Sequence, residues 1–371
     1  MTNVETIIVG AGPAGLACAA SLRQRQRSCL VLEQAGDVGA SWRRHYDRLH
    51  LHTHRKHSGL PGFPMPDSYP RYPSRLQVVE YLEAYAKHYS IDLAFGKRVE
   101  NIRFDDSWTI DTTGGTYQAK NVVIASGFAR LPNRPTWQGQ EHFAGKLLHS
   151  CDFRNALALD AERVLVVGFG NSAGEIALEC AEQGLATGIS VRHPVNVIPR
   201  EMFGVPTLSI AILQQHIPYR FVDAINRPFL RLRFGNLHRY GLRWSRRGPM
   251  TQIVENGRTP LIDIGTMRQI KSGRIRVFGE IESTSDRTVC FRDGSTEQFD
   301  AIILATGYRP AVEEFLPDCP RFDNDSDLTG GQQHSTRDGL YFCGFHVVPT
   351  GHLRQIGLEA QNIAAAIDHS R

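Results

Sequence analysis

The chain has 371 residues, of which 41% are hydrophobic and 22% charged, a composition typical of a globular protein with room for two domains. The formal net charge of +4, from 42 basic and 38 acidic side chains, is too small to indicate a nucleic-acid-binding protein, although it favours anionic ligands. No signal-peptide pattern and no apolar run of about 18 residues is found, so we expect a cytoplasmic protein without a membrane span.

The first predicted elements form a nucleotide-binding unit. An apolar run over residues 6–9 predicts a buried strand, and a glycine motif follows it: Gly10, Ala11, Gly12, Pro13, Ala14 and Gly15. Such glycines permit a tight turn, close approach of a diphosphate and packing of the next helix, here predicted over residues 14–22. A second strand, over residues 28–32, ends in Glu33 and Gln34. A carboxylate at this place binds a ribose hydroxyl and disfavours a 2′-phosphate, so the whole motif predicts FAD.

A second motif of the same kind occurs in the middle of the chain. It follows a strand predicted over residues 164–167 and consists of Gly168, Phe169, Gly170, Asn171, Ser172 and Ala173. A helix over residues 172–182 and a strand over 189–191 come next, and this strand ends in Arg192 rather than in an acid. A cation there is the expected partner of a 2′-phosphate, so we predict NADPH rather than NADH. The predicted contacts are Gly168, Gly170, Asn171, Ser172 and Arg192.

Two more apolar strands indicate how the nucleotide-binding units are joined. Residues 122–127 and 302–307 both predict a strand that ends in a turn of small residues and returns the chain toward the FAD site. Thr306 and Gly307, in the second of these turns, are candidate cofactor contacts.

These elements predict an α/β fold with two Rossmann-like dinucleotide-binding domains, one inserted in the other. The FAD-binding domain is expected to comprise residues 1–159 and 301–371, and a last strand over 340–344 and a closing helix over 357–369 complete it. Residues 160–300 then form the NADPH-binding domain.

Residues 206–234, within the predicted NADPH domain, have mixed helical periodicity, many apolar residues and the clustered arginines Arg227, Arg231 and Arg233. Three interpretations remain open: a helical cap over the substrate entrance, a membrane-surface patch, or a helical pair packed at a domain interface. The sequence leaves the oligomeric state open as well.

The spacing of the cysteines and histidines argues against a disulfide reductase and against a metal site. The seven cysteines form no CxxC or CxxxxC pair, whereas disulfide reductases built on two nucleotide domains need two nearby thiols. Histidines cluster between residues 45 and 57, but because they lie between FAD-proximal elements, we favour flavin or substrate contacts and predict no metal site.

Beyond these motifs, the chain resembles the class B flavin-dependent monooxygenases, and the YUCCA-type branch in particular, over nearly its whole length. Residues 143–153 match the family fingerprint FxGxxxHxxx(Y/F), and residues 305–308 match its second linker motif. Segments that resemble the YUCCA branch are 46–52, 69–73, 200–204 and 259–266. Trp42 and Arg43 resemble the family's flavin-contacting GxxW segment.

The resemblance implies an enzyme in which NADPH reduces FAD, dioxygen forms a C4a-(hydro)peroxyflavin, and one oxygen atom is inserted into a small organic substrate. Oxidative decarboxylation of a 2-oxo acid and N- or S-oxygenation both remain open. Animal-type members place an asparagine beside the flavin where this chain has His52, which YUCCA-type members share, so His52 is the candidate catalytic residue. His149, in the fingerprint, is expected to couple NADPH binding to domain motion, while Arg154 departs from the family pattern.

Two other classes of protein carry the same nucleotide motifs. A reductase that passes electrons to a quinone or carrier protein is disfavoured by the fingerprint around His149, and Gly344-Phe345 replaces the Gly-Asp with which disulfide reductases end this strand. A non-catalytic protein that keeps its nucleotides for structure or redox sensing is disfavoured because both motifs are intact.

Overall fold

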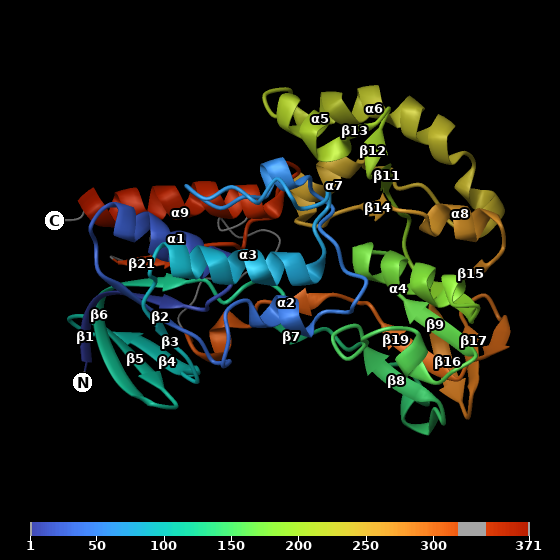
Figure 1. Ribbon diagram of the computed structural model, residues 1–371. Helices are drawn as coiled ribbons and strands as arrows, with labels where there is room; N and C mark the ends of the chain where they lie inside the picture. Colours follow the sequence, from blue (N-terminus) through green and yellow to red (C-terminus); the bar gives the residue numbers. More distant parts are fainter. Residues whose placement is uncertain (1, 318–338, 370–371) are drawn as a thin grey trace. The chain divides into compact units, whose positions relative to one another are not determined.

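A computed structural model describes residues 2–317 and 339–369 (Figure 1). The chain forms two compact units. The first comprises residues 1–44, 53–131 and 309–371, and the second comprises residues 45–52 and 132–308. Two short strands, β7 (Leu131–Pro132) and β20 (Tyr308–Arg309), pair with each other at two of these boundaries.

The first unit is built on a seven-stranded sheet in the order β3-β2-β1-β6-β5-β4, with β21 also paired to β6. Its parallel part carries the nucleotide motif, since β1 pairs in parallel with β2 and β6, and β21 pairs in parallel with the end of β6. The strands are β1 (Thr2–Val9), β2 (Cys29–Leu32), β3 (Leu93–Ala94), β4 (Val99–Phe104), β5 (Trp108–Thr112), β6 (Gly115–Ile124) and β21 (Leu340–Phe342).

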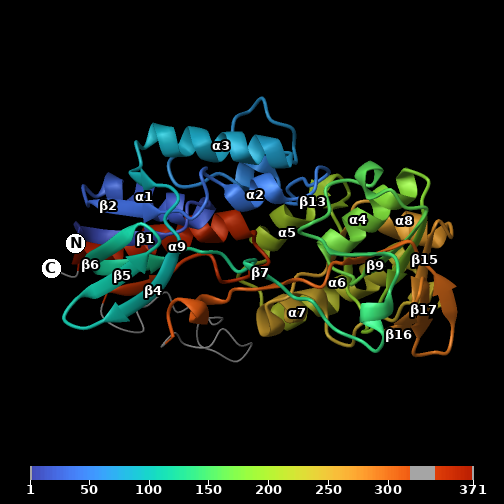
Figure 2. The same ribbon diagram turned by 90° about the horizontal axis from the view of Figure 1, so that it is seen from below.

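Two helices of the first unit, α1 and α9, pack against each other on one side of this sheet, and α1 also contacts α3 (Figures 1 and 2). The core between the sheet and the helices is apolar, as the continuous apolar runs in the parallel strands predict. The helices are α1 (Pro13–Gln24), α2 (Ala40–Arg44), α3 (Arg75–His88) and α9 (His352–His369), with 3₁₀ turns at Arg55–His57 and Val312–Glu314.

The second unit has a five-stranded, wholly parallel sheet in the order β15-β10-β9-β19-β8. The strands of this sheet are β8 (Lys146–His149), β9 (Arg163–Val167), β10 (Ala186–Ser190), β15 (Ile275–Phe278) and β19 (Ala301–Leu304). Smaller sheets accompany it: β11 (Val197–Pro199) with β14 (Leu261–Asp263), β12 (Glu201–Met202) with β13 (Val205–Pro206), and β16 (Ile281–Ser285), β17 (Thr288–Phe291) and β18 (Thr296–Gln298) together.

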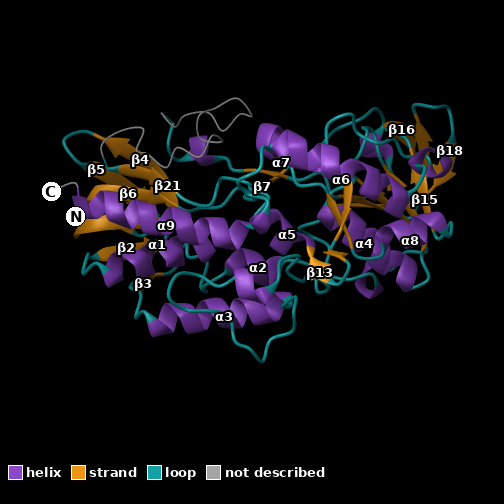
Figure 3. Ribbon diagram, turned by 90° about the horizontal axis from the view of Figure 1, so that it is seen from above, coloured by secondary structure: helices purple, strands orange, loops and turns teal. Residues whose placement is uncertain are grey.

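Helix α4 packs on β9 and β10 of this sheet, and most of the other helices of the second unit follow in the segment after β13 (Figure 3). They are α4 (Asn171–Glu182), α5 (Thr207–Leu213), α6 (Tyr219–Phe234), α7 (Pro249–Asn256) and α8 (Thr266–Lys271). Further 3₁₀ turns lie at Gln140–His142, Leu157–Leu159 and Leu237–Tyr240. No helix in the described ranges is long and apolar enough to cross a membrane.

The boundaries of the second unit differ from the predicted 160–300. Strand β8 pairs with β19, which pairs with β9, so residues 146–149 and 301–304 both belong to the second sheet. The strand around residue 302 was predicted to belong to the FAD-binding domain, and the structure corrects this. A short apolar segment does not reveal its partner in the sequence, because pairing between distant segments leaves no local pattern.

Candidate functional site

The first glycine loop connects β1 to α1 and leaves no space for side chains at two positions. Gly10 has a φ of +109°, and a Cβ there would lie 2.7 Å from the carbonyl oxygen of Ala125. A Cβ at Gly15 would lie only 1.9 Å from the carbonyl oxygen of Gly10. The start of α1 therefore lies directly against the loop, which only glycine permits.

The N-terminus of α1 has the open geometry that a diphosphate needs. Gly12 is the N-cap residue, no side chain caps the helix, and Pro13 occupies the first turn. A Cβ at Gly12 would meet no atom within 4 Å, so the helix start faces free space. Its backbone N–H groups and the helix dipole are available to an anion. Ala14, in the first turn, is buried beneath this surface.

Glu33, the acid predicted to bind ribose, holds the loop itself. One carboxylate oxygen accepts a hydrogen bond from the backbone N–H of Ala11, and the other accepts one from Ala35, both at 2.8 Å. The side chain is buried, whereas Gln34 beside it is exposed. The carboxylate is thus fixed at the glycine loop, with lone pairs left for a hydroxyl donor.

Trp42 and Arg43 lie in α2, close behind the loop. The Arg43 guanidinium donates to the carbonyl oxygen of Val38 at 3.1 Å and forms an ion pair with Glu83 of α3. Trp42 is partly buried. Arg43 therefore stabilises the segment after the loop from within its own unit.

Within the described residues, the buried polar atoms of the first unit that have no hydrogen-bond partner include Oγ of Ser126, Nδ1 of His346 and Nδ1 of His352. Ser126 follows β6 and His346 follows β21, so both lie at the carboxyl ends of parallel strands, as the first glycine loop does. Burial lowers the pKa of His352 to about 4, so this imidazole is neutral at pH 7. Unpaired buried polar atoms at this edge of a sheet fit a polar ligand, and these residues went unrecognised in the sequence.

The second glycine loop repeats the geometry of the first. Gly168 has a φ of +123°, and a Cβ there would lie 2.5 Å from the carbonyl oxygen of Ala305. Gly170 is the N-cap of α4, again without a side-chain cap and with open space around its Cα. The residue that matches Gly15 is Ala173, whose methyl group is buried. A second helix N-terminus is therefore open to an anion.

The polar residues predicted for the second nucleotide have different surroundings. The Asn171 side-chain oxygen accepts a hydrogen bond from the backbone of Ile262 at 2.8 Å, so it holds β14. Ser172 is hydrogen-bonded to the hydroxyl of Tyr46. Arg192 is exposed just after β10, and within residues 2–317 and 339–369 it has no ion-pair partner. Its charge remains available to a ligand.

Thr306 and Gly307 follow β19 and contact other residues of the second unit. The Thr306 hydroxyl donates to the carbonyl oxygen of Asn133, whose backbone N–H donates to Gly307 at 2.9 Å. His149 Nε2 lies 3.2 Å from the same Gly307 oxygen, while Nδ1 accepts from the backbone of Cys151 at 3.2 Å. Nε2 therefore carries the ring proton and donates a hydrogen bond to the carbonyl oxygen of Gly307. Burial lowers the pKa of His149, which keeps the ring neutral.

His52, the predicted catalytic residue, forms a pair with Glu175 of α4. Its Nε2 lies 2.8 Å from a Glu175 carboxylate oxygen, and the Glu175 side chain is only 3% exposed. The approach is close enough for an ion pair, but both carboxylate oxygens lack a well-directed hydrogen bond. Tyr46 lies beside the pair, and burial followed by the Glu175 charge raises its pKa well above the usual value.

No sequence motif pointed to Glu175. A glutamate inside a helix is normally a solvated residue, and only its position one turn after the glycine motif distinguishes it.

The thiols of the described residues include one adjacent pair, Cys18 and Cys343. The hydrogen bond to Cys18, together with burial, raises the pKa of Cys343 well above its usual value, and both side chains are wholly buried. Such thiols are inert toward a substrate disulfide.

Comparison with known proteins identifies the chain. Residues 7–200 match the family described as pyridine nucleotide-disulphide oxidoreductase. Two solved structures have the same fold: a flavin-containing monooxygenase from Stenotrophomonas maltophilia (TM-score 0.75, 21% identity, 99% of this chain and 98% of that one) and an oxidised steroid monooxygenase bound to NADP (TM-score 0.76, 16% identity, 99% and 84%). Indole-3-pyruvate monooxygenase YUCCA1 of Oryza sativa subsp. japonica is 39% identical over 91% of this chain and 86% of its own length.

The Rossmann-type sheets and these relatives define a flavin-dependent monooxygenase of class B, an oxidoreductase with a flavin and a nicotinamide cofactor. Within that class, the chain belongs to the YUCCA family of indole-3-pyruvate monooxygenases. The resemblance found in the sequence is confirmed, and a reductase is not favoured.

Proposed function

We propose that the protein is an NADPH-dependent FAD monooxygenase that inserts one oxygen atom of O₂ into a small organic acid. The observation that carries the proposal is a chemical difference between two glycine loops of the same shape. Glu33, a buried carboxylate, is fixed at the first, while Arg192, an exposed cation without an ion-pair partner in the described chain, follows the strand after the second. An acid suits the free ribose of FAD, and a guanidinium suits the 2′-phosphate of NADPH.

The first unit fits FAD in three ways. The helix start at Gly12 faces open space, and the Glu33 carboxylate retains free lone pairs. Polar atoms without a hydrogen-bond partner in the described residues, on Ser126 and His346, lie just after β6 and β21. The contacts we assign to FAD are Gly10, Gly12, Pro13, Ala14, Gly15, Glu33, Gln34, Trp42 and Arg43. Bound flavin supplies the acceptance of a hydride and the activation of dioxygen.

The second unit fits NADPH by the same reasoning. The N-terminus of α4 would hold the diphosphate, and Arg192 would form charge-assisted hydrogen bonds with the 2′-phosphate. The remaining contacts that we assign are Gly168, Gly170, Asn171, Ser172, Thr306 and Gly307. His149, which joins the end of β8 to Gly307, holds this last turn in place.

We assign the movement of protons to His52. A carboxylate oxygen of Glu175 lies 2.8 Å from Nε2, and this buried carboxylate has no other ion-pair partner in the described chain. Such a pair orients the imidazole ring. We assign to His52 the giving or taking of a proton, with Glu175 as the residue that positions its ring.

The substrate class follows from the relatives. Proteins up to 39% identical over most of the chain are named for indole-3-pyruvate, a 2-oxo acid, and we propose oxidative decarboxylation of a 2-oxo acid here as well. One oxygen atom of O₂ joins the keto carbon, which becomes the new carboxylate, while the bond from this carbon to the original carboxyl group breaks and carbon dioxide leaves. The other oxygen atom is reduced to water by the two electrons of NADPH.

Isotope labelling tests this function directly. The purified protein is supplied with NADPH, indole-3-pyruvate and ¹⁸O₂, and the carboxylic acid product is examined by mass spectrometry. One ¹⁸O atom in the product, with one NADPH consumed for each molecule formed, is the expected result. An unlabelled product, or NADPH oxidation that gives hydrogen peroxide alone with 2-oxo acids, amines and sulfides, would exclude monooxygenation.

A further inference from the structure

The positive charge of the chain is concentrated in one segment, residues 219–247. It contains eight arginines and one acid, Asp223. The rest of the chain has 34 basic and 37 acidic residues, so without this segment the protein would be slightly acidic. A local concentration of this kind raises the affinity of a surface for anions.

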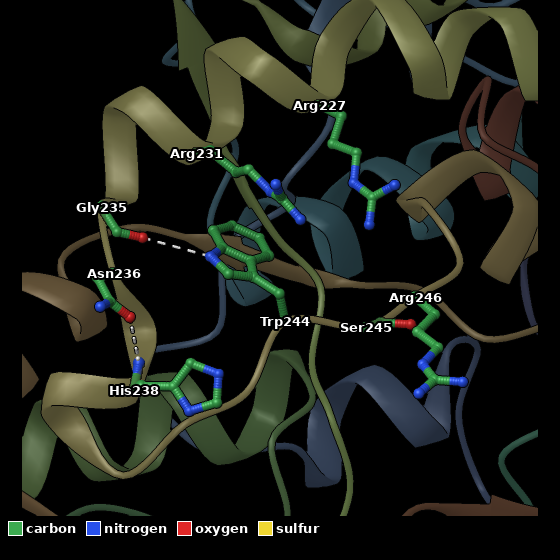
Figure 4. A pocket seen from close by; sticks show the side chains of 8 residues that line it. All are labelled: Arg227, Arg231, Gly235, Asn236, His238, Trp244, Ser245 and Arg246. Carbon is green, nitrogen blue, oxygen red and sulfur yellow. Dashed lines mark hydrogen bonds between the residues drawn. The ribbon is translucent and has the colours of Figure 1, made fainter.

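Three of these arginines lie around one cavity of about 520 Å³. Arg227 and Arg231 are one turn apart on α6, and their side chains descend from the helix toward the segment that contains Trp244 and Arg246 (Figure 4). The remaining lining residues are Gly235, Asn236, His238 and Ser245.

The wall opposite α6 is held firmly. The Trp244 indole N–H donates to the carbonyl oxygen of Gly235 at 3.3 Å, as Figure 4 shows. Backbone hydrogen bonds join Val195 to both sides of Trp244, from Val195 N–H to Arg243 at 2.7 Å and from Ser245 N–H to Val195 at 2.9 Å. A fixed aromatic ring beside exposed cationic side chains is a suitable surface for a planar anionic ligand.

Nearby acids do not neutralise these three arginines. The Asp223 carboxylate accepts hydrogen bonds from the backbone of Met250 and from the backbone and hydroxyl of Thr251. Both of its oxygens are therefore bonded to the start of α7. Glu255 is paired with Arg220 and Arg247. By contrast, none of the cavity's arginines, Arg227, Arg231 and Arg246, has an ion-pair partner within the described chain.

We propose that this arginine-lined cavity is a phosphate-binding site, separate from the two glycine loops. A guanidinium group can donate two parallel hydrogen bonds to two oxygens of the same phosphate. Three guanidinium groups around one cavity therefore match a dianionic phosphate. Trp244 contributes an apolar face for the part of the ligand attached to the phosphate. Since Val195, three residues after Arg192, is hydrogen-bonded to the Trp244 segment, the cavity adjoins the end of β10.

Two sources of phosphate fit this site. One is the 2′-phosphate end of NADPH, which rests on the proposed function. The other is a separate phosphorylated compound, including a lipid headgroup, since Phe221, Ile225 and Leu232 leave large apolar side chains exposed on the same helix. The chemistry is shared, and the experiment below separates the sources.

The first measurement is the binding of inorganic phosphate and of 2′,5′-ADP by calorimetry at low ionic strength. Arg231→Ala is expected to weaken binding about tenfold, and Arg231→Lys to restore part of it. Arg233→Ala is the matched control, because Arg233 is exposed on the same helix but lies outside the cavity, over the Phe234 ring. Arg233→Ala is expected to change the affinity for phosphate less than twofold.

Enzyme kinetics and vesicle binding with the same variants identify the compound that carries the phosphate. A KM that rises for NADPH but not for NADH in Arg231→Ala assigns the site to the dinucleotide. Unchanged kinetics with lost phosphate binding assigns it to a separate ligand, and binding to phosphatidylglycerol vesicles that Arg231→Ala abolishes identifies a lipid headgroup. Absence of saturable phosphate binding in the unaltered protein, or equal losses in Arg231→Ala and Arg233→Ala, would overturn the proposal. Since the phosphate titration needs no turnover, it stands apart from any failure of the proposed function.

Discussion

Gly10 and Gly168 have equivalent places in their two units. Each follows a buried parallel strand, has a positive φ, and lies so close to the carbonyl oxygen of an alanine, Ala125 or Ala305, that only glycine fits. The backbone N–H of each glycine donates a hydrogen bond to the last residue of the neighbouring strand, from Gly10 to the carbonyl oxygen of Leu32 and from Gly168 to that of Ser190. The backbone of a dinucleotide loop is therefore dictated by sterics that are the same in both units.

The two loops differ in what comes after the turn. In the first, a third glycine lets α1 lie against the loop, and Glu33 fixes the loop amides. In the second, Ala173 takes the glycine position, and Arg192 replaces the acid. The shared backbone thus selects a dinucleotide, whereas a few side chains select which one.

The largest effect is expected from exchanging the third residue of the two motifs. In Gly15→Ala the new Cβ would lie 1.9 Å from the Gly10 carbonyl oxygen, so the helix and loop must separate, at a cost of about 3 kcal/mol. The reciprocal change, Ala173→Gly, adds only the conformational entropy of glycine, about 1 kcal/mol. We expect colourless protein from the first variant and yellow protein from the second, measured as flavin absorbance per chain. Equal flavin content in the two would show that α1 does not need its close approach.

Acid pH is expected to affect the first unit through His352. Burial lowers its pKa from 6.5 to about 4, so the folded chain binds fewer protons than the unfolded chain between these values. The stability that this residue contributes is therefore present above pH 6.5 and is lost as the pH falls toward 4, by about 2–3 kcal/mol. Urea unfolding at pH 7, 5 and 4 measures the loss.

In the same series, His352→Gln should lose less stability between pH 7 and pH 4 than the unaltered protein. His142→Gln is the control, because that side chain is 75% exposed, and its unfolding should follow the unaltered protein at every pH. Parallel pH profiles for all three proteins would mean that His352 does not titrate in this range.

An intermediate effect is expected at Arg192, where the two loops differ in charge. Arg192→Ala should raise the KM for NADPH about tenfold, because charge-assisted hydrogen bonds to the 2′-phosphate are lost. The KM for NADH should change less than twofold, since NADH has no phosphate there. Steady-state kinetics with both nucleotides separates the two cases, and equal changes would contradict a phosphate contact.

Local features of both loops could be predicted from the sequence because they depend on neighbouring residues. The turn at Gly10, the start of α4 near Asn171 and the acid at Glu33 all follow from spacing along the chain. The boundary of the second unit could not be predicted in this way, because it depends on the pairing of β8 with β19, which are distant in sequence. For the same reason the partner of His52 was missed: Glu175 is distant in sequence, and its burial is visible only once α4 is packed.

The smallest effect is expected at the pair of Glu175 and His52. Glu175→Gln removes the charge beside Nε2 but preserves the shape, so FAD and NADPH should bind normally while proton transfer becomes less efficient. We expect a two- to fivefold increase, of order 1 kcal/mol, in hydrogen peroxide released per NADPH. Glu175→Asp, which keeps the carboxylate, should recover part of the coupling, and His52→Ala should match or exceed the effect of Glu175→Gln.

Glu182→Gln provides the matched control for this last prediction. Glu182 is on the same helix and also forms an ion pair, with Arg48, but it is 36% exposed, so its replacement should leave the peroxide yield unchanged. A purely structural role for Glu175 would lower thermal stability in both Glu175 variants without changing the peroxide yield. An increase that appears in Glu175→Gln, diminishes in Glu175→Asp and is absent in Glu182→Gln can arise only from the charge next to His52, because the three variants share the helix and differ in where the carboxylate lies.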